Sequence, residues 1–214
     1  MKISMTRKSR FGVAAALLFL AVTASACGAG SISPPASKVP TDGSSPSAAA
    51  TDKRVPIEKN PPGDIPDNLA FVAYTNKAGS YAFTHPEGWA QTGANANVQF
   101  TDKLNGVNVD SLSASQAPNV ANAKSTDVPR LKKSVPAFEL RKVSAVTLPG
   151  GTGVRIVFRR NSEPDAVTGK VYRDEVEEYS VFKSGRLVRM DLYGPVGADN
   201  VDAYRTMSQS LSIR

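Results

Sequence analysis

Residues 171–193 read VYRDEVEEYSVFKSGRLVRMDLY, and this stretch decides the fold class of the chain. In its second half, Val188, Met190 and Leu192 alternate with charged or polar residues. Such alternation is typical of a β-strand with one buried face, and a segment containing Ser184-Gly185 between two such runs indicates a hairpin. The two halves are therefore predicted to pair as antiparallel strands.

Four further strands follow from the same alternation. Residues 140–148 and 154–159 are expected to form a second hairpin. Residues 98–101 and 107–109 are expected to form a third, with the turn at Asn105-Gly106, because this dipeptide readily adopts the positive φ angles of a two-residue turn. The predicted sheet is therefore mostly antiparallel.

Two helices are predicted beside these strands. Asp127 can cap a helix through Val135, with Pro129 in its first turn. A terminal helix can begin after Asp199 or Asn200. Its apolar stripe consists of Val201, Tyr204, Ser208 and Leu211. The expected fold class is α+β, with a mostly antiparallel central sheet flanked by helices.

Three segments together resemble a known family. They are the aromatic run YAFTHPEGW at residues 81–89, the strand at residues 98–102, and the terminal helix ending near Leu211. The chain from about residue 70 to residue 214 looks like a PsbP-like domain, and the LpqN-type lipoproteins of mycobacteria are similar to it. This resemblance implies an accessory or scaffold protein on a membrane complex, and the shared motifs contain no catalytic residue.

The N-terminus has the layout of a secretory signal peptide. Residues 1–10 contain four basic residues and no acidic one, and residues 11–22 are an unbroken apolar run. Small residues follow before Cys27. A membrane-spanning helix needs about 20 apolar residues, so this run is too short to be an anchor by itself.

Ala24-Ser25-Ala26-Cys27 resembles the bacterial lipoprotein processing motif. The resemblance implies cleavage between Ala26 and Cys27, a diacylglyceryl group on the Cys27 sulfur, and a further acyl chain such as palmitate on the new N-terminus. The motif favours Leu at the position of Ala24. Because the small residues also suit ordinary signal peptidase, a freely secreted protein is the alternative.

The chain is thus predicted to comprise three parts: a lipoprotein signal peptide over residues 1–26, a flexible linker over residues 27–70, and an α+β domain over residues 71–214. The linker is rich in Pro and Ser, so it is not expected to bury enough apolar surface to fold alone. The first 26 residues hold four of the 26 basic and none of the 19 acidic residues, so the rest carries a net charge of only +3. This argues against nucleic-acid binding. The Ala- and Gly-rich composition looks like that of an actinobacterial envelope lipoprotein.

The sequence offers few residues for catalysis. A single Cys and a single His exclude a disulfide framework and a Cys/His zinc site. His85 precedes a proline at a strand end, where its ring could be exposed, but no Gly-x-Ser-x-Gly motif accompanies it. Four carboxylates could supply an acid pair for glycoside hydrolysis, an oxygen site for calcium or, more plainly, a solvated face paired with arginines: Asp174, Glu175, Glu177 and Glu178.

Arginines on the predicted strands form a candidate anion-binding patch. Its members are Arg155, Arg159 and Arg189. Guanidinium groups fork onto phosphate or carboxylate oxygens, so the patch could hold an anionic glycan, a teichoic-type polymer or lipid phosphate. The alternative is ordinary cross-strand pairing with Glu and Asp.

The leading functional hypothesis is a non-catalytic binding or accessory module on the outer face of the cell membrane. Its partners would be membrane lipid, through acylated Cys27, and an envelope protein or anionic polymer. No cofactor, metal or nucleic acid is expected. A carrier of a small apolar or anionic ligand is the alternative, and an envelope hydrolase is the third hypothesis.

Overall fold

A computed structural model describes residues 52–59 and 62–214 of the chain. These residues belong to one compact unit. The predicted signal peptide, Cys27 and most of the predicted linker lie outside the described residues.

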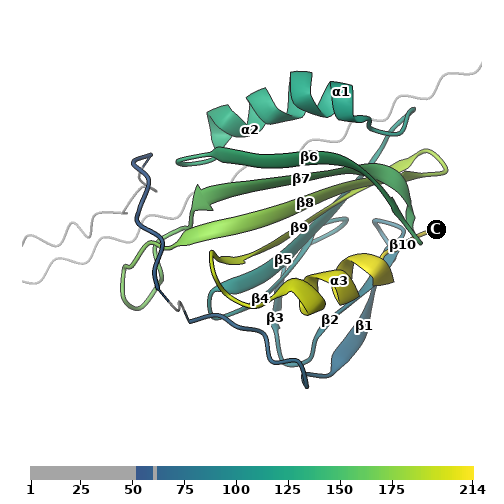
Figure 1. Ribbon diagram of the computed structural model, residues 1–214. Helices are drawn as coiled ribbons and strands as arrows, with labels where there is room; N and C mark the ends of the chain where they lie inside the picture. Colours follow the sequence, from purple (N-terminus) through teal and green to yellow (C-terminus); the bar gives the residue numbers. More distant parts are fainter. Residues whose placement is uncertain (1–51, 60–61) are drawn as a thin grey trace, which may run out of the picture. The chain divides into compact units, whose positions relative to one another are not determined.

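An antiparallel sheet of seven strands forms the centre of this unit, in the order β3-β4-β5-β9-β8-β7-β6 (Figure 1). It confirms the expected α+β class and the predicted hairpins. Its strands are β3 (Ala90–Thr92), β4 (Val98–Asp102), β5 (Asn105–Ser113), β6 (Glu139–Leu148), β7 (Gly151–Asn161), β8 (Arg173–Lys183) and β9 (Arg186–Pro195).

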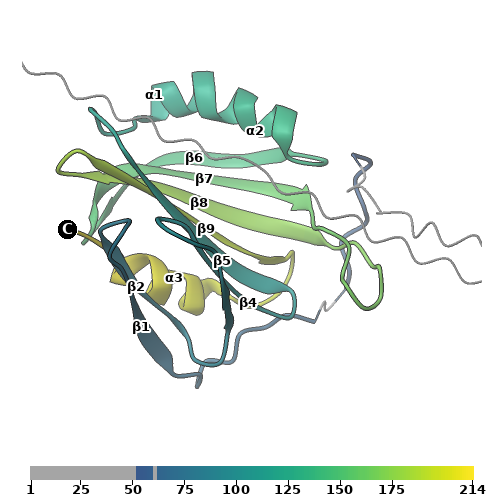
Figure 2. The same cartoon turned by 180° about the vertical axis from the view of Figure 1, so that it is seen from behind.

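Each face of this sheet is covered over part of its width. A small sheet and the terminal helix cover the core face, as Figure 1 shows. They comprise β1 (Phe71–Asn76), β2 (Tyr81–Pro86), β10 (Ser212–Ile213) and α3 (Val201–Ser210). A second helical segment covers the opposite face, here called the helix face, and Figure 2 shows it from behind. It comprises α1 (Val120–Asn122), the π-helical turn η1 (Ala123–Asp127) and α2 (Val128–Ser134).

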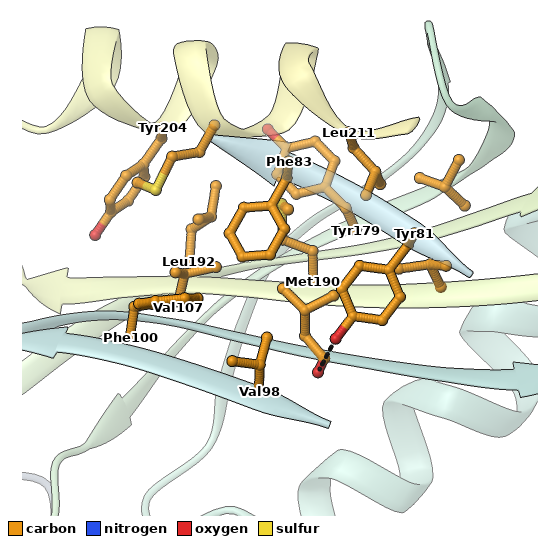
Figure 3. Close-up of a cluster of buried hydrophobic side chains, with 14 of the residues drawn as sticks. Tyr81, Phe83, Val98, Phe100, Val107, Tyr179, Met190, Leu192, Tyr204 and Leu211 are labelled. Atoms are coloured by element: carbon orange, nitrogen blue, oxygen red, sulfur yellow. Dashed lines mark hydrogen bonds between the residues drawn. The ribbon is translucent and has the colours of Figure 1, made fainter. Parts of the chain in front are cut away.

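The main hydrophobic core lies between the central sheet and the layer of β2 and α3 (Figure 3). Tyr81 is completely buried, and its hydroxyl lies 3.0 Å from the carbonyl oxygen of Ala96 and 3.3 Å from that of Val109. A hydroxyl can donate only one proton, so it donates to one of the two at a time. Other buried members come from several elements: Phe83, Phe100, Val107, Met190, Leu192, Met207 and Leu211.

A second core lies under α1 and α2 on the helix face. Phe138 packs against Phe158 with ring centroids 5.3 Å apart. The buried residues of this cluster are Ala123, Leu131, Val154, Ile156, Phe158 and Val176. On the helix face, the helical segment α1–α2 therefore covers β7 and β8. On the core face, the small sheet and α3 cover β4, β5 and β9.

The hairpin β4–β5 forms as predicted, but its turn lies two residues earlier. Asp102 pairs with Asn105, so Lys103 and Leu104 make the turn, and Lys103 has a φ of 52°. Gly106 instead lies in β5, where a β-carbon would overlap the ring of Tyr193. The close approach of Tyr193 therefore explains this glycine better than a turn does.

The first helical segment also differs from the prediction. It begins at Val120 and not at Asp127, which lies inside the continuous helical segment and makes no capping hydrogen bond. The cap is Asn119, whose side chain accepts a hydrogen bond from the amide of Asn122 at 2.9 Å. Pro129 does lie in the first turn of α2.

The end of the predicted linker packs on the domain. Ile65 is buried in the main core, and its amide donates to the Asn200 side chain at 2.8 Å. Asn200 in turn donates to Asn105 at 2.9 Å, and Asn105 donates to the carbonyl of Gly63 at 2.7 Å. Asn200 is the N-cap residue of α3, as expected, but its side chain holds this segment and does not cap the helix.

Candidate functional site

The three arginines of the predicted patch lie on two different faces of the sheet. Arg155 pairs across strands with Tyr179, which pairs with Met190, so Arg155 and Arg159 belong to the core face. Arg189 neighbours Met190 in β9 and therefore points to the helix face. The prediction of one anion-binding patch made of these three residues is thus wrong.

Each of these arginines has an acidic partner. Arg155 pairs with Glu177, and Arg159 Nε lies 3.0 Å from Glu175 Oε2. On the helix face, Arg189 lies 3.8 Å from Asp110 and 3.6 Å from Glu178. The alternative interpretation, cross-strand pairing, therefore describes these arginines better.

His85 lies in the aromatic core and not at an exposed edge. Its ring stacks on Phe100, with the centroids 3.7 Å apart, and its Nδ1 lies 2.9 Å from the carbonyl oxygen of Pro86. Burial lowers its pKa, so the ring is neutral at pH 7. Trp89, at the end of the same aromatic run, is likewise buried in the main core.

The four carboxylates of β8 divide between the two faces. Glu175 and Glu177 lie on the core face and pair with Arg159 and Arg155. Asp174 and Glu178 point to the helix face, and each is only 2% exposed. The predicted pairing with arginines is present, but a solvated face is the wrong description for these two residues.

Charged side chains, the acids Asp174 and Glu178 buried and the arginines partly exposed, continue across the helix face beside α2. Glu178 Oε1 lies 3.7 Å from Nη2 of Arg130 in α2 and 3.6 Å from Nε of Arg189 in β9. Asp191 follows on β9. Together with Asp110, Arg160 and Asp174, these residues form what we call the charged strip, on which Arg160 Nε lies 3.5 Å from Asp174 Oδ2.

Burial shifts three acids of the charged strip, Glu178, Asp174 and Asp191, toward their neutral forms. It raises the pKa of Glu178 to about 7, with the charge of Asp191 as the second cause. Burial likewise raises the pKa of Asp174 and of Asp191 to about 6. The arginines act in the opposite direction but do not compensate for the lost hydration.

Polar atoms on this strip lack hydrogen-bond partners among the described residues. These buried atoms are Asn108 Oδ1, Arg160 Nε, Glu178 Oε1, Arg189 Nε and Asp191 Oδ1. No sequence motif marks this cluster, since its members come from β5, β7, β8 and β9 and from α2. The register of the strands is needed to place them on one face.

On each face of the central sheet a cleft lies beside the charged side chains. One, of about 330 Å³, lies between α3 and β6, and Arg155, Glu177 and Tyr204 line it. The other, of about 420 Å³, lies on the helix face, where Arg160 and Tyr193 line it. The Arg160 guanidinium carbon lies 4.8 Å from the centroid of the Tyr193 ring. Both clefts therefore present charged as well as apolar side chains.

Within residues 52–59 and 62–214, no group of three or more His, Cys, Asp or Glu side chains is arranged to hold a metal ion. None of the helices in that part of the chain is long and apolar enough to cross a membrane. Cys27 and the cleavage motif at Ala24, Ser25 and Ala26 lie outside the described residues.

No family model and no curated protein matches the sequence. Several solved structures are similar. The PsbP protein of the cyanobacterium Synechocystis is 16% identical, with 71% of this chain and 98% of that chain covered and a TM-score of 0.48. LpqN of Mycobacterium tuberculosis, described as involved in cell envelope biogenesis, is 14% identical, with 69% and 92% covered and a TM-score of 0.41. The Ran-binding protein Mog1p of Saccharomyces cerevisiae is 9% identical, with 68% and 96% covered and a TM-score of 0.44.

Proposed function

We propose that this chain is an exported lipoprotein that acts as a non-catalytic binding or accessory module on the outer face of the membrane. One observation carries the proposal: the only cysteine among 214 residues directly follows Ala24-Ser25-Ala26 after a basic segment and an apolar run. In this account Cys27 becomes the acylated N-terminus. Two or three acyl chains anchor a protein durably, whereas one chain binds only marginally.

The placement of the polar side chains supports a binding role. A hydrolase using His85 and the carboxylates of β8 needs them in one pocket. His85 lies in the aromatic core instead, and Asp174 and Glu178 face away from Glu175 and Glu177. The carboxylates are held in ion pairs, which suits a rigid recognition surface.

A carrier of a small ligand is the second candidate. The cleft between α3 and β6 has the location that this function needs, because it lies between the sheet and a helix. However, Arg155, Glu177 and Arg205 line it beside Val146 and Tyr204. A carrier of an apolar ligand would present a mainly apolar wall, so the lining counts against an apolar ligand and leaves an anionic one as the form of this second candidate.

Detergent partitioning of the protein made in a lipoprotein-processing bacterium tests the anchor. Wild type should enter the detergent phase, and Cys27→Ala should remain in the aqueous phase because the acylated sulfur is gone. Ser25→Ala is the matched control: it keeps a small residue and the cysteine, so it should partition like wild type. Equal partitioning of wild type and Cys27→Ala into the aqueous phase would contradict the proposal.

A further inference from the structure

The described chain begins beside the first residues of β6. Asp52 accepts a hydrogen bond from the amide of Ala137 at 3.0 Å, and Arg54 Nη1 lies 3.4 Å from Glu139 Oε2. Val55 donates to Asn161 at the end of β7 at 3.2 Å. The point at which the N-terminal part of the chain joins the domain is therefore fixed at one end of the sheet.

Exposed basic side chains gather at the same end. Lys132 and Lys133 occupy the last turn of α2, and four residues separate that helix from β6. Arg141 and Lys142 follow on β6, which is an edge strand of the central sheet. With Arg54 these residues form what we call the basic patch.

The patch keeps most of its positive charge. Two carboxylates lie at this end of the domain: that of Asp52, and that of Glu139, the only acidic residue from Val128 to Lys142. Asp52 holds the amide of Ala137, so Glu139 is the acid that faces the arginines. Its carboxylate is shared, because Arg54, Arg141 and Arg173 all lie within 3.4 Å of its oxygens. One carboxylate cannot neutralise three guanidinium groups as well as the lysines of α2. Beside these charges Leu140 is 41% exposed, which is unusual for a large apolar side chain.

The position of Cys27 places a lipid surface within reach. Only 24 residues separate Cys27 from Asp52. A chain of this length spans at most about 85 Å. If Cys27 is acylated, as proposed above, the 24 residues after it tether the domain to the membrane and join it beside the basic patch. The local concentration of the patch at the membrane surface is then high. Lys and Arg side chains near an anionic bilayer are attracted to it.

We propose that the basic patch binds anionic lipid headgroups and turns the α2–β6 end of the domain toward the membrane, with Leu140 at the interface. The β8–β9 turn, at the far end of the strands, then faces away. This inference rests on the proposed anchor for its location, and it adds an orientation and a chemical partner.

Co-sedimentation with vesicles tests the headgroup surface without acyl chains. The protein is the chain from residue 27 onward with Cys27→Ala, and the vesicles contain phosphatidylcholine alone or with 30 mol% phosphatidylglycerol. Binding should require the anionic lipid and should be lost at high salt, because salt screens exposed charges. Lys132→Ala with Lys133→Ala should lower the partition coefficient about 25-fold, since each charge near the surface contributes about a factor of five.

Two exposed lysines at the opposite end of the strands provide the matched control. Lys183 lies in the last position of β8, and Lys77 lies in the β1–β2 turn, where Gly79 contacts Ser111 near the end of β5. Replacing both with Ala removes the same charge and should leave the partition coefficient within about twofold of the parent chain. Thermal unfolding confirms that all variants are folded.

The outcomes separate this inference from the anchor. If wild type is acylated but the Cys27→Ala chain does not bind vesicles, the proposed headgroup surface is wrong and the proposed anchor stands. If the Cys27→Ala chain binds vesicles but wild type is not acylated, the proposed anchor is wrong and the headgroup surface stands. An equal drop in the partition coefficient of the Lys77→Ala, Lys183→Ala control would also overturn the lipid assignment. Displacement of the chain from vesicles by an equal charge of soluble polyglutamate would overturn it in favour of an acidic polymer.

Discussion

Arg130 in α2 and Glu178 in β8 form an ion pair, with Nη2 and Oε1 3.7 Å apart, that joins the helix to the charged strip of the sheet. The Glu178 side chain is 3% exposed, whereas that of Arg130 is 44% exposed. The pair thus combines a buried acid with a base that reaches solvent. Because burial already disfavours the carboxylate, the protonation state of Glu178 governs how much this contact contributes to stability.

The stability of the domain should increase as the pH falls from 8 to 5. The pKa of Glu178 is raised to about 7 and those of Asp174 and Asp191 to about 6, so the folded state takes up protons that the unfolded state binds only at lower pH. This stabilisation is complete below the unfolded pKa values and is lost as the pH rises through the folded ones. His85 opposes part of this gain, because its lowered pKa disfavours the protonated ring in the folded state, so we expect a net gain of about 2 kcal/mol at pH 5 relative to pH 8. Urea unfolding at a series of pH values measures it, and a flat profile over this range would refute the assignment.

Glu178→Gln should remove much of this pH dependence. The amide has the shape of the protonated acid and carries no charge to desolvate, so the variant should be more stable than wild type at pH 8, by about 1–2 kcal/mol, and similar to it at pH 5. The same urea titrations provide the measurement.

The matched control for that substitution is Glu175→Gln on the opposite face. Glu175 is 40% exposed and pairs with Arg159. Exposed pairs contribute about 0–1 kcal/mol, so this variant should follow the pH profile of wild type. A flattened profile in the control, or an unchanged one in Glu178→Gln, would assign the pH dependence to other groups.

Asn200→Ala should release the segment around Ile65. The substitution removes the acceptor of the Ile65 amide and a donor to Asn105, both buried. Loss of two buried partners is expected to cost about 2–3 kcal/mol of folding stability. Hydrogen exchange should accelerate at the Ile65 amide.

Asp199→Ala is the control for this release. Asp199 is exposed, and it holds the segment through its backbone amide, which donates to Asp64 at 2.9 Å. The alanine variant keeps this amide, so exchange at Ile65 should not change. Similar exchange in both variants would show that Asn200 does not hold the segment.

Tyr81→Phe should destabilise the main core without changing its packing. The Tyr81 hydroxyl accepts from Asn76 Nδ2 at 3.2 Å and reaches the carbonyl of Ala96 at 3.0 Å. Its removal leaves buried polar atoms with fewer partners, at a cost of about 1–2 kcal/mol. Tyr172→Phe, in the loop before β8, should have little effect. Equal midpoints of thermal unfolding for wild type and Tyr81→Phe would contradict this account.

The strands were predictable because their apolar residues alternate over long runs, as from Val188 to Leu192. The turn at Lys103-Leu104 was not, because the preference of Asn-Gly for turns is outweighed by the register that brings Phe100 opposite Val107 in the core. The helix start at Val120 was also missed, since Asn, Ser and Thr residues between positions 119 and 127 weaken the helical pattern.

The candidate arginine patch failed for a geometric reason. Side chains alternate between faces along a strand, so the face of Arg189 depends on the register of β8 with β9 and of β7 with β8. Once the turn at Ser184-Gly185 fixes Lys183 opposite Arg186, Arg189 pairs with Ser180 and lies on the helix face. Residue types alone predict neither this register nor the burial of Glu178 beneath Arg130.

The mass of the exported protein tests the central claim most directly. The account predicts a chain that begins at Cys27 and carries the added mass of a diacylglyceryl group, with or without a further acyl chain on its N-terminus. An unmodified chain, whether it begins at Cys27 or retains the apolar run, would contradict the lipoprotein assignment.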